Sequence, residues 1–480
     1  MLDLRPDTTG LASLIASHRA RIGIIGLGYV GLPLATEFAK QFRTLGFDVD
    51  ERRVEAMNAG VSHIGDVPSA TIAALVRDEQ FEATCDFTRL GDCDCVIVCV
   101  PTPLDRGKEP DLSYIMSAGK AIAQQLRAGQ LIVLESTTYP GTTEELLLPL
   151  LRETGLELDR DFSLAFSPER VDPGNAAFEL SQIPKVVGGC SEESGDLAAL
   201  LYGEIFVSVH RVSNARVAET AKLLENTFRS VNIGLANEMA LLCHQMGISS
   251  REVIEAASTK PFGFMPFHPG PGVGGHCIPL DPLYLSWKAR QYGFSPRFIG
   301  LADEINSAMP EHVVGLVASA LNDFEKALRN AQIVVLGLAY KHDVADIRHS
   351  PALTIIDRLR AAGAIVRYHD PFVPFFDPED ADVPSGRVVG WNDIAERRAK
   401  RRAASEGTVR LVESRVNGRR RDDPLASVEL DDDLLRACDC VVVATAHTSI
   451  DYARVARLTR LVVDTRNVVP SGQLAKVVHL

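Results

Sequence analysis

The stretch 21-RIGIIGLGYVG-31 decides the fold of the first part of this chain. Residues 21–26 form a short apolar run with β-branched side chains, which is typical of a buried strand. Three glycines follow in the pattern G-x-G-x-x-G: Gly26, Gly28 and Gly31. Residues 32–42 then have apolar side chains at helical spacing, and a second apolar run ends at Asp48. Strand, glycine turn, helix, strand and terminal acid in this order predict a dinucleotide-binding Rossmann domain.

The glycine turn would bind the pyrophosphate of a dinucleotide. Glycines let backbone N–H groups approach phosphates at a helix N-terminus, where the helix dipole favours negative charge. Tyr29 and Val30 lie within the same turn and are assigned to the cofactor site with it. Asp48 would accept hydrogen bonds from the adenosine ribose and repel a 2′-phosphate, which predicts NAD rather than NADP. Arg53, also assigned to this site, and its neighbour Arg52 weaken that preference slightly. A purely structural glycine turn is the alternative.

Three later apolar runs each end in a polar loop, at residues 95–100, 131–134 and 162–166. In open α/β sheets, ligands bind beyond the carboxyl ends of the strands. We therefore expect Thr102 and Thr137 near the cofactor or its reacting carbon, and Glu169 with Arg170 at the same edge. The segment around Thr137 also reads as an ordinary turn followed by a helix cap, because Pro140 and two threonines follow.

Residues 214–246 contain no proline and predict one long helix. One stripe of this helix has mainly polar residues at steps of three, four or seven: Glu219, Lys222, Asn226, Ile233 and Asn237. Most other positions are apolar or small, so Lys222 is expected to be buried and to need a partner or a catalytic role. A structural ion pair with Glu219 is the alternative. Such a long central helix also suits a dimer interface.

The stretch 269-PGPGVGGHCIPLDP-282 is rich in glycine and proline, including Gly274, and predicts a rigid loop rather than a helix or strand. It presents a single thiol, Cys277, and a carboxylate four residues later, Asp281. That arrangement suits covalent catalysis by the thiolate. An inert buried cysteine in a tight loop is the alternative. Phe267, just before the loop, would pack on a ligand or anchor the loop.

The C-terminal part repeats the strand pattern of the first domain, with 333-IVVLGLAY-340 beside 22-IGIIGLGY-29. Its glycine turn keeps Gly337 alone, which predicts a second α/β domain that does not bind a dinucleotide in the usual manner. Three cations follow its first and last strands: Lys341, Arg348 and Arg466. Cations at strand ends suit a nucleotide diphosphate, and surface charges in a polar loop are the alternative. A basic insertion at about residues 392–426 reads as a partly disordered surface segment, and a role in contacting a partner or an acidic surface is the alternative.

Composition limits the function classes further. At 480 residues the chain predicts two or three domains, and its net charge of −13 disfavours general binding to nucleic acid or an anionic membrane. No apolar run approaches the roughly 20 residues that span a bilayer. The first 20 residues lack the basic start and apolar core of an export signal, so a short helix over residues 9–19 is expected instead.

The nine cysteines favour reduced thiols in the cytoplasm, because the number is odd and most lie inside apolar runs. Two C-x-C pairs occur: Cys93 with Cys95, and Cys438 with Cys440. At strand spacing each pair would share one face, and neither pair has a second ligand pair nearby. We interpret them as buried small side chains and expect no metal site.

Seven motifs together resemble the UDP-glucose/GDP-mannose dehydrogenase family: GLGYVG, VPTP, ESTTYPGTT, SPER, ETAKLLENTFR, GPGVGGHCIPLDP and GLAYKHDVADIRHSPA. The resemblance implies an α/β protein with a helical lead-in (1–20), a Rossmann NAD-binding domain (21–210), a central all-helical dimerisation domain (211–325) and a Rossmann-like UDP-sugar-binding domain (326–480). The sequence around the cysteine is similar to that of the branch of the family that acts on UDP-N-acetylhexosamines. Leu280 stands where other branches usually have lysine, and His276 precedes the cysteine.

The resemblance implies an enzyme that oxidises the C6 alcohol of a nucleotide sugar to a carboxylate with two NAD, through a cysteine thiohemiacetal and thioester. Six residues would carry the chemistry: Cys277 as nucleophile, Lys222 and Asn226 for oxyanions, Glu169 as base, and Asp281 with Thr137 orienting water or Lys222. The substrate would contact Glu169, Arg170, Lys222, Asn226, Phe267, Gly274, Lys341 and Arg466. The cofactor would contact the glycine turn, Asp48, Arg53, Thr102, Thr137 and Arg348.

The expected product would feed the synthesis of surface polysaccharide precursors, and the expected assembly is a homodimer or a larger homo-oligomer. Three alternatives stay open. The first is a UDP-glucose or GDP-mannose 6-dehydrogenase. The second is a two-electron dehydrogenase of the hydroxyacid type, which would need no cysteine loop or third domain. The third is a non-catalytic nucleotide-sugar binder with the basic insertion as its interaction element.

Overall fold

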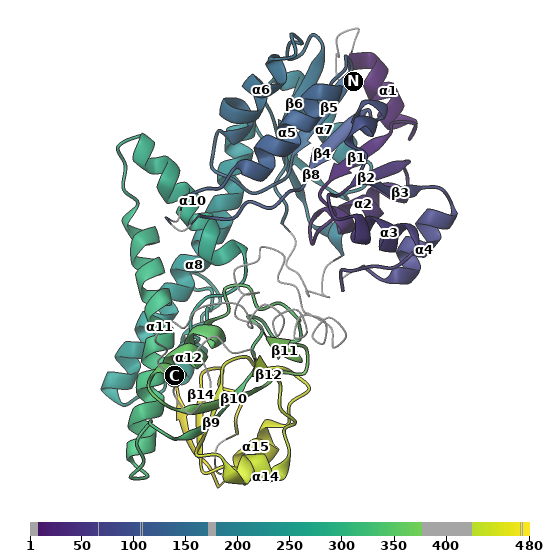
Figure 1. Ribbon diagram of the computed structural model, residues 1–480. Helices are drawn as coiled ribbons and strands as arrows, with labels where there is room; N and C mark the ends of the chain where they lie inside the picture. Colours follow the sequence, from purple (N-terminus) through teal and green to yellow (C-terminus); the bar gives the residue numbers. More distant parts are fainter. Residues whose placement is uncertain are drawn as a thin grey trace, which may run out of the picture. The chain divides into compact units, whose positions relative to one another are not determined.

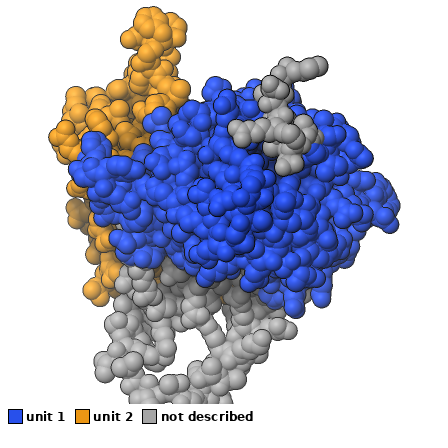
Figure 2. All heavy atoms as spheres, turned by 90° about the horizontal axis from the view of Figure 1, so that it is seen from above, with its two compact units in different colours: residues 1–226, 280–295 blue, residues 227–279, 296–480 orange. Residues whose placement is uncertain are grey.

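The computed structural model describes residues 8–65, 67–105, 107, 109–170, 179–376, 425–470, 472 and 474–480. These residues form two compact units, each built around its own sheet, mostly parallel in the first unit and fully parallel in the second (Figure 1). The first unit comprises residues 1–226 and 280–295, and the second comprises residues 227–279 and 296–480 (Figure 2). Almost all of the predicted basic insertion lies outside the described residues.

The first unit contains an eight-stranded sheet in the order β3-β2-β1-β4-β5-β6-β7-β8. Its strands are β1 (Ile22–Ile25), β2 (Thr44–Phe47), β3 (Phe81–Thr84), β4 (Cys95–Val98), β5 (Gln130–Leu134), β6 (Phe162–Phe166), β7 (Lys185–Gly189) and β8 (Val209–Arg211). Neighbouring strands from β3 to β6 are parallel, whereas β7 runs antiparallel to β6. The order reverses between β1 and β4, which is where open α/β sheets bind their ligands.

Helices cover both faces of this sheet (Figure 1). They are α1 (Thr8–Ala16), α2 (Gly31–Ala39), α3 (Glu51–Asn58), α4 (Ser69–Arg77), α5 (Ser113–Gln125), α6 (Leu148–Arg152) and α7 (Glu192–Gly203), with short turns η1 (Phe87–Asp92), η2 (Thr143–Leu147) and η3 (Leu180–Gln182). The strands alternate between two apolar clusters, since Ile97 packs on one face and Val96 and Val98 pack on the other. The Rossmann domain predicted from the glycine turn is confirmed.

The prediction that the two cysteines of each C-x-C pair lie on one face of a strand is wrong. Cys93 ends the turn η1 and packs on one side of the sheet, whereas Cys95 begins β4 and packs on the other. Cys438 and Cys440 are divided in the same way. The first cysteine of each pair belongs to a helical ending and not to the strand, so the two-residue alternation does not apply. All four thiols are buried, and burial raises the pKa of Cys93 to about 12 and that of Cys438 to about 11.

The second unit contains a five-stranded parallel sheet in the order β10-β9-β13-β14-β15. Its strands are β9 (Gln332–Leu336), β10 (Ile365–His369), β13 (Cys440–Val443), β14 (Leu461–Asp464) and β15 (Lys476–His479), and an antiparallel pair adds β11 (Phe375–Phe376) and β12 (Leu425–Ala426). Its own helices are α9 (Ser250–Ser258), α11 (Arg297–Asn322), α12 (Pro351–Ala361), α14 (Asp432–Ala437) and α15 (Tyr452–Leu458). The predicted second α/β domain is therefore present.

Two helices belong to both units. The helix α8 (Ala215–Met246) confirms the long helix predicted over residues 214–246. The helix α10 spans Cys277–Gln291. No helix in the described part of the chain combines the length and apolarity that a membrane span requires.

The prediction that residues 269–282 form no helix is wrong from Cys277 onward, because α10 begins at that cysteine. Pro279 lies in the first turn, where backbone N–H groups have no intrahelical acceptor and a proline costs little. Pro282 lies inside the helix. The glycine-rich part, residues 270–275, precedes the helix as the predicted loop.

Candidate active site

The glycine turn after β1 has the shape of a dinucleotide cradle. Gly26 has φ +91°, and a Cβ there would lie 2.6 Å from the carbonyl oxygen of Cys99. A Cβ on Gly31, the first residue of α2, would collide with the carbonyl oxygen of Gly26. A Cβ on Gly28 would meet no atom within 4 Å. Gly28 therefore faces open space at the start of a helix, and this space suits a pyrophosphate.

Asp48 follows β2 at the same edge of the sheet and is largely buried. Its Oδ2 accepts a hydrogen bond from the backbone N–H of Leu27 at 3.0 Å, so the carboxylate fixes the glycine turn. Its Oδ1 accepts from the backbone N–H of Asp50 at 3.0 Å. Asp50 caps α3 and lies 3.6 Å from the guanidinium of Arg53. Asp50 is thus a second carboxylate beside the predicted ribose site, which the sequence analysis missed.

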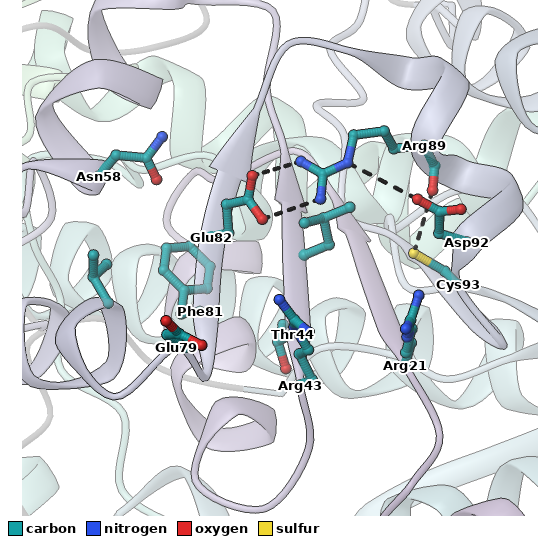
Figure 3. Close-up of a pocket in the computed structure, with 12 residues that line it drawn as sticks. Arg21, Arg43, Thr44, Asn58, Glu79, Phe81, Glu82, Arg89, Asp92 and Cys93 are labelled. Carbon is teal, nitrogen blue, oxygen red and sulfur yellow. Dashed lines mark hydrogen bonds and ion pairs between the residues drawn. The ribbon is translucent and has the colours of Figure 1, made fainter.

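A hollow of about 460 Å³ lies at the opposite edge of the sheet (Figure 3). Its lining includes Arg21 and Arg43, which immediately precede β1 and β2. Arg89 also lines it and forms two hydrogen bonds with Glu82, at 2.5 and 3.0 Å. Because dinucleotides bind at the carboxyl ends of parallel strands, this hollow at the amino ends is not the predicted cofactor site.

The loops after β4 and β5 are fixed from the helices. The hydroxyl of Tyr284 on α10 donates a hydrogen bond to the carbonyl oxygen of Thr102. Thr137 is half-buried, whereas its neighbour Thr138 is buried and shares a hydrogen bond of 2.9 Å with the hydroxyl of Thr142. The buried neighbour is the more firmly held of the two threonines.

Glu219 of α8 binds the loop that follows β5. Its carboxylate accepts hydrogen bonds from the backbone N–H groups of Gly141 and Thr143 and from the Thr143 hydroxyl at 2.7 Å. Burial raises the pKa of Glu219 to about 7, although these hydrogen bonds oppose the increase. The carboxylate of Glu219 thus stabilises the loop. The alternative from the sequence, a structural ion pair between Glu219 and Lys222, does not describe these contacts.

We expect Glu219→Gln to change how stability depends on pH. The carboxyl group has a pKa of about 7 in the folded protein and an ordinary value of 4.5, so the folded state binds more protons between these values. The free energy of unfolding of the wild type should therefore fall, relative to the variant, by on the order of 3 kcal/mol as pH rises through this window. Urea unfolding of both proteins between pH 4.5 and 7.5 measures this. Parallel curves would contradict the assignment.

Lys222, Asn226 and Asp281 lie together in the first unit, as the sequence predicted for α8 and the segment after the cysteine. Lys222 is 7% exposed and Asp281 is 1% exposed. The amide of Asn226 donates a hydrogen bond to Oδ2 of Asp281. Burial raises the pKa of Asp281 to about 6, although the positive charge of Lys222 and the bond from Asn226 both oppose this. A carboxyl group of this kind can exchange a proton near neutral pH.

Cys277 is the first residue of α10, one turn before Asp281, and its side chain is exposed. Cys277 thus lies at the positive end of the helix dipole. The other eight cysteines, all among the described residues, are buried or half-buried. Burial lowers the pKa of the preceding His276 to about 4, and Arg348 adds to this effect, so the imidazole is neutral at pH 7. The inert buried cysteine that the sequence left open is not what the structure shows.

The glycine loop before Cys277 rests on the second unit's own sheet edge. The backbone N–H of Gly275 donates to the carbonyl oxygen of Arg348 at 2.9 Å. A Cβ on Gly274 would lie 2.7 Å from the Tyr340 side chain. Asn237 of α8 accepts a hydrogen bond from the backbone N–H of Gly270 at 2.9 Å. The ring of Phe267 packs edge-on against Phe228 of α8, so Phe267 anchors the loop.

The three predicted cations lie at the carboxyl ends of the second sheet. Arg348 forms hydrogen bonds to both carboxylate oxygens of Asp346, the shortest at 2.6 Å. Arg466 donates from Nε to the carbonyl oxygen of Ala444 at 2.8 Å, and burial lowers its pKa to about 10. Lys341 is half-buried on the loop after β9. Arg348 is thus committed to a neighbouring carboxylate, which the sequence alone did not show.

Sequence reasoning missed one group of charged residues entirely. Lys185, at the start of β7, is buried between the carboxylates of Glu135 and Glu169. Glu135 immediately follows β5, and Glu169 lies on the loop after β6. A lysine ahead of an apolar run reads as the exposed start of a strand, so no pattern in the sequence distinguishes Lys185.

Three comparisons identify the family. Models of the UDP-glucose/GDP-mannose dehydrogenase family match in succession: the NAD binding domain over residues 20–206, the central domain over 216–308 and the UDP binding domain over 334–471. UDP-N-acetyl-D-glucosamine 6-dehydrogenase from Pseudomonas aeruginosa is 38% identical over 355 residues, which are 74% of this chain and 83% of the relative. UDP-N-acetyl-D-mannosamine dehydrogenase from Pyrococcus horikoshii is 40% identical over 393 residues, covering 78% and 92% of the two chains.

Solved structures agree with these matches. UDP-D-ManNAc dehydrogenase from Pyrococcus horikoshii superposes with a TM-score of 0.80 at 32% identity, over 96% of this chain and 98% of that chain. NDP-N-acetyl-D-galactosaminuronic acid dehydrogenase from Methanosarcina mazei superposes with a TM-score of 0.75 at 28% identity, over 99% and 97%. This chain belongs to the UDP-glucose/GDP-mannose dehydrogenase family and is an NAD-dependent nucleotide-sugar dehydrogenase.

Proposed function

We propose that the protein oxidises the C6 alcohol of a UDP-N-acetylhexosamine to the uronate in two successive two-electron steps, with two NAD per sugar. The observation that carries the proposal is α10, which begins at the exposed thiol of Cys277. One turn later the same helix places Asp281 beside Lys222 and Asn226. A two-electron alcohol dehydrogenase needs a proton acceptor, but it needs no nucleophile.

NAD, held by the glycine turn and Asp48, would supply the hydride acceptor for both oxidations. In the first step the C6 hydroxyl loses its proton. The ammonium of Lys222 stabilises the negative charge that develops on the C6 oxygen, and Asn226 donates a hydrogen bond beside it. Asp281 fixes the amide of Asn226 and balances the charge of Lys222. Its pKa of about 6 lets it exchange the released proton near neutral pH.

In the second step the thiolate of Cys277 attacks the aldehyde carbon and forms a C–S bond, and the carbonyl oxygen becomes the thiohemiacetal hydroxyl. Oxidation of this adduct leaves a thioester. Glu169 then takes a proton from water, and the water oxygen attacks the thioester carbon. The C–S bond breaks, which regenerates the thiolate of Cys277 and releases the uronate. This sequence keeps the reactive aldehyde bound to the protein. In this mechanism Thr137 orients the attacking water, and the cations Lys341 and Arg466 bind the nucleotide.

The substrate branch is proposed from the relatives and from two residues. The relatives at 35–40% identity include dehydrogenases named for UDP-N-acetyl-D-glucosamine and UDP-N-acetyl-D-mannosamine. His276 immediately precedes Cys277 and has a neutral imidazole, and Leu280 lies three residues after the cysteine, so neither position carries a charge. Incubation with NAD and a panel of UDP-sugars tests the branch. Turnover of the N-acetylhexosamines above UDP-glucose is expected, and a preference for UDP-glucose or GDP-mannose would overturn it.

We further propose that the product serves the synthesis of surface polysaccharide precursors and that the protein acts in the cytoplasm. None of the nine cysteines, all of which lie among the described residues, forms a disulfide, although two pairs are close in sequence. Reduced thiols of this number fit a reducing compartment.

We propose that α8 pairs with α8 of a second copy to form a homodimer. Large apolar side chains lie exposed along this helix at steps of four and seven residues: Leu224, Phe228, Leu235, Leu242 and Met246. Residues seven apart lie on one face of a helix, and an exposed apolar stripe of this length is typical of an interface.

The double substitution Leu235→Glu with Leu242→Glu is expected to convert the dimer to a monomer, because it places four carboxylates in the apolar stripe of the pair. Light scattering after size exclusion measures the mass. Arg251→Glu on α9, whose side chain is exposed, serves as the control. A wild type that elutes as a monomer, or a double variant that remains a dimer, would contradict the assignment.

A further inference from the structure

A buried lysine lies at the edge of the first sheet where the proposed base for hydrolysis is found. Lys185 begins β7 and is 2% exposed. Its Nζ lies 2.8 Å from Oε1 of Glu135 and 3.5 Å from Oε2 of Glu169. Because β7 runs antiparallel to β6, its first residue lies at the carboxyl end of β6, beside the loop that carries Glu169. A parallel strand would have placed this lysine at the opposite edge of the sheet.

The lysine is held in place from several elements. Glu135, after β5, also accepts a hydrogen bond of 2.6 Å from the hydroxyl of Tyr202 on α7. The rings of Tyr202 and Phe206 have their centroids 5.2 and 5.3 Å from Nζ of Lys185. The thiol of Cys99, after β4, lies 4.0 Å from the other oxygen of Glu135. These contacts fix the position of the ammonium group. Of its two carboxylate partners, Glu169 is the more exposed, so Lys185 can influence the active site through Glu169.

The positive charge of Lys185 faces the carboxylate of Glu169. A buried ammonium is retained in a folded protein when carboxylates compensate for its lost hydration. Burial lowers the pKa of Lys185, but Glu135 and Glu169 outweigh burial and raise it, so the lysine stays charged. Glu169 is 9% exposed, and its Oε1 accepts a hydrogen bond of 2.6 Å from the backbone N–H of Arg170. One oxygen is thus oriented by the backbone while the other faces the ammonium.

We propose that Lys185, fixed by Glu135 and Tyr202, is a positioning residue that keeps the Glu169 carboxylate ionised and oriented for hydrolysis of the thioester. The proposal rests on the proposed function, since it assigns a supporting group to its second half. Lys185 does not touch the reacting atoms and acts through Glu169. Its charge should therefore matter for the release of the uronate and not for the first oxidation.

The test measures uronate release against pH in two variants with opposite expected effects. Lys185→Met removes the cation beside Glu169, so the acidic limb of the profile should move up by about one pH unit or more. Glu135→Gln removes the carboxylate that competes with Glu169 for the ammonium of Lys185, so the acidic limb should move to lower pH. Rapid mixing should show that the first NADH appears at the wild-type rate in both variants.

Two controls separate this role from a purely structural one. Lys288→Met removes another buried lysine of the first unit, which pairs with Glu145 at 2.6 Å, and it should leave the limb unmoved. Lys185→Arg keeps the charge and should restore the limb. If Lys185→Met does not fold, Glu135→Gln and Lys185→Arg decide the question. An unmoved limb, or shifts in the same direction for both charge variants, would overturn the proposal. A wild type that releases no uronate would instead overturn the proposed function.

Discussion

Cys277→Ser is expected to lower the rate of uronate release by about 10³-fold or more, because a serine hydroxyl is not ionised near pH 7 and attacks an aldehyde poorly. The first oxidation does not use the thiol, so the variant should still form one NADH per site. It should then accumulate the aldehyde or a slowly hydrolysed ester. Rapid mixing followed by mass spectrometry of the protein and the sugar separates these species.

The matched control for this experiment is Cys85→Ser, which changes a half-buried thiol after β3 in the first unit. It should leave both NADH phases and the uronate yield at wild-type values. Cys277→Ser with an unchanged uronate yield would eliminate the thioester mechanism. A covalent sugar adduct on the wild-type protein, lost in Cys277→Ser and retained in Cys85→Ser, would support it directly.

Lys222→Met is expected to reduce kcat by about 10²- to 10³-fold with a smaller change in KM, which is the loss typical of removing one group that stabilises a developing oxyanion. Methionine has a similar length and no charge, so the buried site keeps its packing. Removing the cation should also raise the pKa of Asp281 further, since the positive charge of Lys222 lowers it in the wild type. The pH optimum of the first oxidation should therefore move up.

The measurement is the rate of the first NADH phase under single-turnover conditions from pH 5 to 9. Lys288→Met again serves as the control, since it removes a buried lysine on α10 that pairs with Glu145. A Lys222→Met variant with normal kcat would return this residue to a structural role. A change confined to KM would show that it binds the substrate equally in the ground state and the transition state.

The sequence predicted those parts of the fold that depend on local pattern. The glycine turn, the buried strands around it and α8 each follow from the spacing of glycine or apolar residues over a short window. Lys222, Asn226 and Asp281 could be brought together because the long helix fixes the first two and the motif fixes the third. Cys277 was singled out by a different argument, as the single thiol in a segment rich in glycine and proline.

The remaining features depend on contacts between distant segments, or on how local signals compete. The helix α10 can begin at Cys277 because Pro279 lies in its first turn, where backbone N–H groups lack acceptors, and a rule that treats every proline as a helix breaker misses this. Glu219 bonds to a loop more than 70 residues away. Lys185 was missed because its position depends on β7 running antiparallel to β6, a direction that no residue pattern within β7 records.

Counting NADH against uronate distinguishes a four-electron oxidation from a two-electron one. The purified protein is incubated with excess NAD and a limiting amount of UDP-N-acetylglucosamine or its epimers, and absorbance at 340 nm is compared with the uronate measured by mass spectrometry. Two NADH are expected for each uronate on at least one of these sugars, with no free aldehyde. One NADH per sugar with an aldehyde or ketone as product would contradict this expectation, and so would binding of the UDP-sugars without turnover.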